Sequence, residues 1–209
     1  MSVSVPVFDQ SKRILFLWLS APLFAGLMVF SATAWTEDMF LAESLEQLGV
    51  MLVIACVVGR CWSTLYIGGR KNAALVVNGP YRYMRNPLYF FSTLGLAGIG
   101  LVLESLMLAA ALTAFGYLTF ALVARREERT LHELFGAEYE AYRRQVPAFF
   151  PMPRAGQGGP RVPETATFSP QLLTRTFIDA SYFLLIFPFA ELMEILHDQG
   201  IVPAFLHLY

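Results

Sequence analysis

Two polar segments hold the residues of this sequence whose types and spacing are best suited to chemistry. The first, residues 79–89, combines turn-forming Gly and Pro with two arginines and an asparagine, immediately before a long apolar run. The second, residues 125–151, begins with Arg-Arg-Glu-Glu-Arg directly after another apolar run. Carboxylates such as Glu127 and Glu128 accept hydrogen bonds or protons, and guanidinium groups hold anions. Polar side chains at the boundary of a membrane-length apolar segment usually mark a functional site.

A helical hairpin is the element that must position these segments. Residues 88–103 and 106–123 are both apolar, and only Leu103-Glu104-Ser105 separates them. Two antiparallel helices with so short a connection return the chain to the side from which it started. The sequence therefore predicts that the two polar segments meet at one membrane face.

The composition independently indicates a membrane protein. Hydrophobic residues make up 56% of the 209 residues and charged residues 15%, and the mean hydropathy is +0.52. Soluble domains contain ~25% charged residues, so the composition argues against a soluble globule. Crossing a hydrocarbon core of ~30 Å requires about 20 apolar residues. We expect an all-α integral membrane protein with about five transmembrane helices, at residues 14–34, 47–67, 88–103, 106–123 and 177–196.

The expected organisation has four parts. Residues 1–71 form N-terminal transmembrane helices, residues 72–151 form the core with both polar segments, residues 152–176 form a Pro- and Gly-rich linker, and residues 177–209 form a C-terminal transmembrane helix and tail. A cleavable signal peptide is the competing interpretation of the N-terminus. The apolar stretch is longer than an ordinary signal sequence and no small-residue cleavage site follows it, which favours an anchor.

The distribution of cations predicts the orientation. All fifteen Lys and Arg residues precede the first expected span, lie at or beyond the end of the second, or lie between the fourth and fifth. The loops on the opposite side contain only acidic charges. The positive-inside rule therefore places the N-terminus and both polar segments in the cytoplasm.

Cysteine and histidine usage does not indicate a metal site. Cys56 and Cys61 share one apolar span at a spacing that fits neither a metal site nor a redox pair. His132, His197 and His207 form no cluster in the sequence. We expect no metal ion.

The order of the motifs resembles a known family. Gly79-Pro80-Tyr81-Arg82 and Arg85-Asn86-Pro87-Leu88-Tyr89 precede the apolar hairpin, and Glu127-Glu128, Leu131, Phe135-Gly136, Tyr139 and Tyr142 follow it. Over residues 72–151 this pattern resembles the membrane methyltransferases of the isoprenylcysteine carboxyl methyltransferase and phospholipid methyltransferase group. The resemblance implies S-adenosyl-L-methionine as the cofactor.

The resemblance also implies which residues bind the cofactor. They are Ala73, Ala74, Leu75, Val76, Tyr81, Asn86, Pro87, Leu88, Tyr89 and Glu127. Asn86 stands where the family has a histidine, so this side chain does not titrate near neutrality. Val123 stands where the isoprenylcysteine branch has a substrate-orienting arginine, which leaves the acceptor open.

Arg85 and Glu128 are the candidate catalytic residues. Arg85 is suited to orienting an anionic head group, and Glu127 or Glu128 to accepting a proton from an amine. The expected partners are a lipid or prenylated small-molecule substrate and membrane lipids, without nucleic acid. Carboxyl methylation is favoured. The alternatives are a phospholipid amine or thiol methyltransferase, an NADPH-dependent membrane reductase similar to the sterol reductases, and a non-catalytic membrane binding module.

Several of these residues also have structural interpretations. Asn86 precedes Pro87, which fits the first turn of a helix, so its side chain is a natural N-cap for a free backbone N–H. Glu127 can pair with a neighbouring arginine on a helix surface. Tyr139 and Tyr142 are typical of an amphipathic helix at the membrane surface. Gly136 is then expected to end the preceding helix.

Overall fold

A computed structural model describes residues 22, 24–33, 39–68, 74–152, 168–203 and 205–208. Long helices dominate these ranges, which confirms the all-α class. They are α2 (Met39–Ile67), α3 (Pro87–Val102), α4 (Leu106–Gln145), α5 (Pro170–Ser181) and α6 (Ile186–Asp198). Single 3-10 turns cover Gly79–Arg82 before α3 and Tyr182–Leu185 between α5 and α6. A short parallel ladder pairs β1 (Ser31–Thr33) with β2 (Leu206–Leu208).

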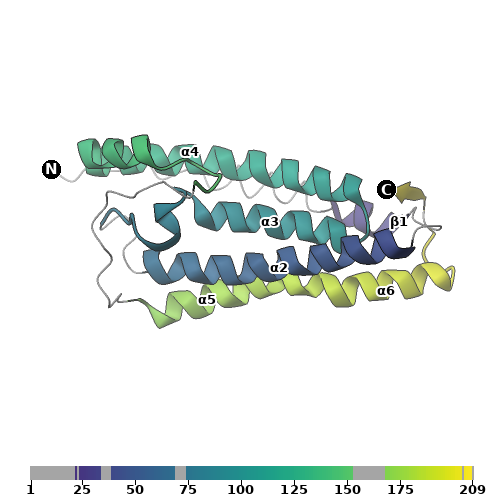
Figure 1. Ribbon diagram of the computed structural model, residues 1–209. Coiled ribbons are helices and arrows are strands. Elements are labelled where there is room, and N and C mark those ends of the chain that lie inside the picture. The colour runs from purple at the N-terminus through teal and green to yellow at the C-terminus, as the bar shows by residue number, and fades with distance from the viewer. Residues whose placement is uncertain are drawn as a thin grey trace.

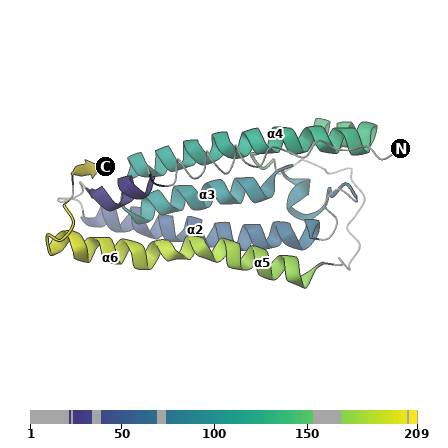
Figure 2. The ribbon, with the colours of Figure 1, turned by 180° about the vertical axis from the view of Figure 1, so that it is seen from behind.

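The helices lie side by side in an elongated bundle. Figure 1 shows α3 between α4 and α2, with α5 and α6 running along the other side of α2, and the view from behind in Figure 2 shows the same order. Helices α2, α3, α4 and α5 alternate in direction and α6 continues α5, so the end of α2, the start of α3, the end of α4 and the start of α5 share one end of the bundle (Figure 1). This arrangement confirms that the hairpin returns the chain to the side from which it started.

Close backbone contact between α2 and α3 holds the centre of the bundle. A Cβ atom at Gly98 would lie 2.8 Å from the carbonyl oxygen of Gly49 and 2.9 Å from Cγ2 of Val53. Val53 is itself fully buried in the core. Small residues let membrane helices approach closely enough for dispersion contacts to stabilise the pair. The glycines of these two helices therefore set their separation.

We expect Gly98→Ala to lower the free energy of unfolding by about 1–3 kcal/mol, because backbone atoms must move to admit one methyl group. Thermal unfolding of the detergent-purified chain measures the change. The matched control is Gly26→Ala, since a Cβ atom there meets nothing within 4 Å. Equal stability of the two variants would contradict the close packing of α2 on α3.

The long helix α4 reverses direction at Gly136. Residues 128 and 143 would lie ~22 Å apart along a straight helix with ~1.5 Å rise per residue. The guanidinium of Arg85 nevertheless donates to the Glu128 carboxylate at 3.0 Å and to the Arg143 carbonyl at 3.1 Å. Gly136 has φ 48° and ψ −118°, a conformation accessible to glycine alone. The expected break at this glycine is confirmed, and residues 137–145 fold back along the preceding turns.

The spans differ in detail from the expected ones. Three helical stretches are long and apolar enough to cross a membrane, Phe40–Ile67, Leu106–Gln145 and Pro170–Asp198, and α3 is a shorter apolar helix. The last stretch starts at Pro170 rather than at 177. Of the first expected span, residues 14–34, the parts 14–21, 23 and 34 lie outside the described residues. Of that span, residues 24–30 are helical, and Phe24 contacts Phe115 of α4 with ring centroids 4.9 Å apart.

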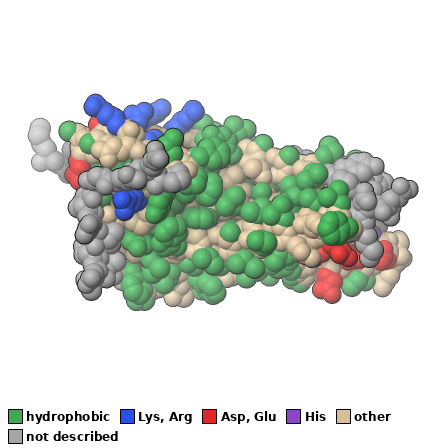
Figure 3. Space-filling view, viewed as in Figure 1, with side chains coloured by type: hydrophobic (Ala, Val, Ile, Leu, Met, Phe, Trp, Pro, Cys, Tyr) green, Lys and Arg blue, Asp and Glu red, His purple; other side chains and the backbone are tan. Residues whose placement is uncertain are grey.

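Charge is separated along the bundle. Figure 3 shows a broad apolar middle, Lys and Arg side chains gathered at the end where α4 finishes, and a group of Asp and Glu side chains at the opposite end. The apolar middle contains exposed large side chains such as Met51, Ile54 and Val58 on α2. An exposed apolar surface of this extent is typical of contact with lipid. The chain is therefore a membrane protein with one basic end.

Candidate functional site

The two polar segments meet at the basic end of the bundle. The first segment begins with the 3-10 turn Gly79–Arg82 and continues into the start of α3 at Pro87. The second follows the apolar part of α4 and ends in the extended stretch after Gln145. Side chains and backbone atoms from both segments hydrogen-bond to one another, as the hairpin predicts.

An ion pair between Arg85 and Glu128 forms the centre of this meeting point. Arg85 Nε lies 3.0 Å from Glu128 Oε1, and Nη2 lies 3.2 Å from Oε2, so the contact is bidentate. The two side chains are only 10% and 16% exposed. Arg85 Nη1 also donates to the carbonyl oxygens of Arg143 and Val146. Arg85 thus joins the start of α3 to the parts of α4 before and after Gly136.

The side chain of Asn86 does not cap α3, contrary to the expectation from the sequence. Its residue occupies the N-cap position, but the side chain makes no capping hydrogen bond. Instead, Nδ2 donates to Glu128 Oε1 at 3.1 Å and to the Ala148 carbonyl at 2.9 Å. The prediction of a capping side chain was wrong because a carboxylate and a carbonyl from distant segments compete for the amide. A charge-assisted hydrogen bond to Glu128 is stronger than one to a neutral acceptor.

Backbone hydrogen bonds reinforce the junction. The amide of Arg85 donates to the Pro147 carbonyl at 2.9 Å, and that of Asn86 to the Ala148 carbonyl at 3.2 Å. The Met152 amide donates in return to the carbonyl of Tyr83 at 3.1 Å. Sequence patterns alone gave no signal for this pairing, because it joins two irregular segments some 60 residues apart.

Three tyrosines line the same region. The Tyr142 hydroxyl donates to the Tyr81 carbonyl at 2.6 Å. Burial raises the pKa of the Tyr81 phenol well above its usual value, and the nearby Tyr142, Glu127 and Tyr89 raise it further, so Tyr81 stays neutral. The Tyr139 hydroxyl is buried and has no hydrogen-bond partner in the part of the chain that the structure describes. Tyr139 and Tyr142, interpreted from the sequence as surface residues, therefore belong to this region.

The remaining predicted site residues surround this junction or lie outside the described ranges. Asn86 and Pro87 are buried, and Leu88, Tyr89 and Glu127 are half-buried. The Tyr89 ring stacks on Phe120 of α4 with centroids 5.4 Å apart. The segment Ala74–Val76 runs from an exposed alanine to half-buried Leu75 and Val76, whereas Ala73 lies outside the described residues.

The groups at this junction fit the chemistry of S-adenosylmethionine. Glu127 lies close enough to Tyr81 to influence its ionisation, and carboxylates accept hydrogen bonds from ribose hydroxyl and ammonium groups. Aromatic faces attract a sulfonium cation as they do other cations. The unpartnered hydroxyl of Tyr139 supplies a further buried polar group. The junction thus combines negative charge, aromatic rings and polar groups at a membrane boundary.

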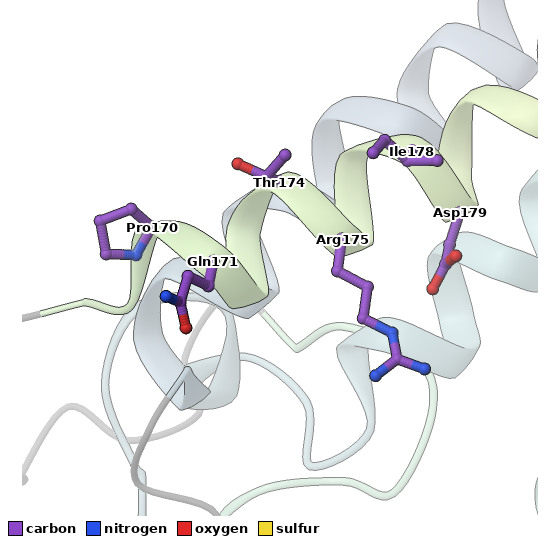
Figure 4. A pocket seen from close by; sticks show the side chains of 6 residues that line it. All are labelled: Pro170, Gln171, Thr174, Arg175, Ile178 and Asp179. Atoms are coloured by element: carbon purple, nitrogen blue, oxygen red, sulfur yellow. The ribbon is translucent and has the colours of Figure 1, made fainter.

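A groove on the surface of α5 lies apart from these residues. It is lined by Pro170, Gln171, Thr174, Arg175, Ile178 and Asp179 (Figure 4). The six side chains all come from one helix and leave it in several directions, so the groove is shallow (Figure 4). None of the predicted site residues lines it. We therefore place the candidate site at the junction of the two polar segments.

Comparison with known proteins identifies the family of the chain. The model of the phospholipid methyltransferase family matches residues 38–138, which include both α3 and the apolar part of α4. Cobalt-zinc-cadmium resistance protein CzcN of Cupriavidus metallidurans is 35% identical over 177 residues, covering 85% of this chain and 79% of the relative. Nickel-cobalt-cadmium resistance protein NccN of Alcaligenes xylosoxydans xylosoxydans is 40% identical over 115 residues, covering 55% and 54%. No solved structure matches the chain. The protein therefore belongs to the phospholipid methyltransferase family.

Proposed function

We propose that this protein transfers a methyl group from S-adenosylmethionine to a lipophilic acceptor at the basic end of the bundle. The observation that carries this proposal is the contact of Arg85 and Asn86 with Glu128. It brings the segment 86–89 next to Glu127, although some 40 residues separate them in sequence. In the family resemblance these are the parts that bind the cofactor. Family membership supports the reaction class.

The chain's own residues would bind and align the reactants. S-adenosylmethionine, when bound, supplies a methyl group whose bond to sulfur breaks as a lone pair on an acceptor O, N or S atom bonds to the methyl carbon. Glu127 would accept hydrogen bonds from the cofactor, and Tyr81 would offer a neutral aromatic wall. Alignment of this kind and exclusion of water can supply much of the rate enhancement.

The contacts of Arg85 and Glu128 favour a positioning role for both. Both Glu128 carboxylate oxygens receive hydrogen bonds from Arg85, and Oε1 receives another from Asn86. With both oxygens occupied by these donors, the Glu128 carboxylate is engaged in the junction rather than with a reactant. We therefore propose Glu127 as the proton acceptor if the methyl acceptor is an amine. A carboxylate or thiolate acceptor is already anionic and needs no base.

The proposal also includes the methyl acceptor and the orientation of the protein in the membrane. The basic end of the bundle would face the cytoplasm by the positive-inside rule, where a water-soluble cofactor can enter. A lipid carboxylate remains the favoured acceptor. The two relatives are named for resistance to cobalt, zinc, cadmium and nickel. Thiolates are ligands for soft metal ions, so lipophilic thiols belong among the acceptors to be tested.

Calorimetric titration of the detergent-purified chain tests the cofactor. We expect S-adenosylhomocysteine, the product form of the cofactor, to bind with micromolar affinity, and NADPH to show no binding. Binding of NADPH alone would instead support a membrane reductase. Binding of neither would support a non-catalytic membrane module and would overturn the proposed reaction.

A further inference from the structure

Helix α2 carries an arginine within an apolar stretch. Arg60 lies seven residues before the end of α2 at Ile67, or about 10 Å along the helix axis. Placing an arginine within a membrane span is costly at the centre and less costly near an end. Intramembrane cations are usually paired with an anion or serve a site. The partners of Arg60 therefore indicate which of these applies.

The described partners of Arg60 are uncharged and leave several of its donors unused. Arg60 Nη1 donates to the hydroxyl of Ser92 on α3, and Ser92 Oγ donates in turn to the Leu88 carbonyl at 2.8 Å. Arg60 Nε is buried and has no hydrogen-bond partner among the residues that the structure describes. Within the described ranges, no carboxylate forms an ion pair with Arg60. A guanidinium has five donors, so most of its capacity to bind an anion remains.

The surroundings of Arg60 are uncharged. Cys56, one turn earlier on α2, is fully buried, and a Cβ at Gly59 would meet the ring of Phe91. One turn later, the Thr64 hydroxyl donates to Thr176 of α5. In an apolar environment an unpaired charge interacts strongly with any anion that reaches it. The Arg60 side chain is half-buried rather than sealed, so a ligand can approach it.

Arg60 also lies near the predicted cofactor segment. Its partner Ser92 is six residues after Asn86, about 9 Å along α3, and bonds to the carbonyl of Leu88. Arg85, the other candidate for holding an anion, already donates to Glu128 and to two carbonyl oxygens. Arg60 is thus a cation with spare donors on the membrane side of the junction.

We propose that Arg60, supported by Ser92, binds the anionic oxygen group of the lipophilic acceptor, a carboxylate or a phosphate. Such a group on a hydrocarbon chain would neutralise the arginine and satisfy its remaining donors, while the chain stays in the apolar part of the bundle. This inference rests on the proposed function, because it identifies the acceptor as an anionic lipid. It assigns recognition of the head group to α2, outside the two polar segments.

Binding of paired lipid probes to the intact chain in neutral detergent tests this inference. The first pair is radiolabelled hexadecanoate and hexadecan-1-ol, and the second is dioleoyl phosphatidate and dioleoylglycerol. We expect the wild type to prefer the anionic member of at least one pair by about tenfold or more, as a hydrogen-bonded charge contact provides. A preference confined to the first pair identifies a carboxylate, and one confined to the second a phosphate. Arg60→Gln should abolish the preference, whereas Arg60→Lys should keep part of it.

The control is Arg144→Gln, which removes an exposed arginine at the end of α4 and should leave the preference unchanged. S-adenosylhomocysteine binding by Arg60→Gln, equal to that of the wild type, would show that the variant is folded. Equal binding of charged and uncharged probes to the wild type would overturn the inference, as would a preference that survives in Arg60→Gln. If the wild type shows the preference but does not bind S-adenosylhomocysteine, the proposed function fails and the anion site remains.

Discussion

Replacing Glu128 with alanine is expected to lower the free energy of unfolding by about 3 kcal/mol, because it leaves the charge of Arg85 unpaired in a nearly buried site. The Asn86 amide loses an acceptor at the same time. Arg85 joins the start of α3 to the parts of α4 before and after Gly136, so we expect all the contacts of the junction to weaken together. Thermal unfolding of the detergent-purified chain measures the loss of stability.

Two matched variants distinguish the effect of breaking the Arg85–Glu128 ion pair from the effect of removing any carboxylate. Glu140→Gln removes the exposed contacts of Glu140 with His132 and Arg143, and exposed pairs contribute less than ~1 kcal/mol. The double variant Arg85→Met/Glu128→Met should be more stable than Glu128→Ala, because it leaves no buried charge unpaired. If Glu128→Ala and Glu140→Gln unfold alike, the pair does not hold the junction.

Glu127→Ala should weaken S-adenosylhomocysteine binding by about tenfold to a hundredfold, the effect of losing a hydrogen bond to a charged group. The stability of this variant should change less than that of Glu128→Ala, because Glu127 is half-buried and the bonds from Arg85 and Asn86 go to Glu128. Calorimetric titration measures the affinity. Glu133→Ala, which removes an exposed carboxylate further along the same helix, is the control. An unchanged affinity in Glu127→Ala would exclude this glutamate from the cofactor site.

These two predictions distinguish neighbouring carboxylates with different surroundings. Glu128 faces Arg85 and Asn86, so its removal should act mainly on stability and only through stability on binding. Glu127 lies near Tyr81, so its removal should act on binding. A pair of adjacent residues in one helix points about 100° apart around the helix axis, which explains how one sequence motif can serve both purposes.

The sequence by itself determined the class of the protein and the meeting of the two polar segments. Apolar runs of membrane length can satisfy their backbone hydrogen bonds in lipid only as helices or closed barrels, and the length of the runs here indicates helices. A connection as short as Leu103-Glu104-Ser105 leaves an antiparallel hairpin as the outcome. Gly136 was also predictable as a break, because glycine commonly ends a helix.

Only the tertiary structure decided how the polar side chains are used. The sequence predicted that the Asn86 side chain would cap α3, but its amide donates to Glu128 and to the Ala148 carbonyl instead. Arg85 was a candidate for substrate binding, but it already holds Glu128 and two carbonyl oxygens. Arg60 lay in an apolar run without a motif, and its contact with Ser92 follows from the packing of α2 on α3. Local sequence cannot reveal such choices, because the competing partners lie 32 to 62 residues away and the fold determines which of them come within reach.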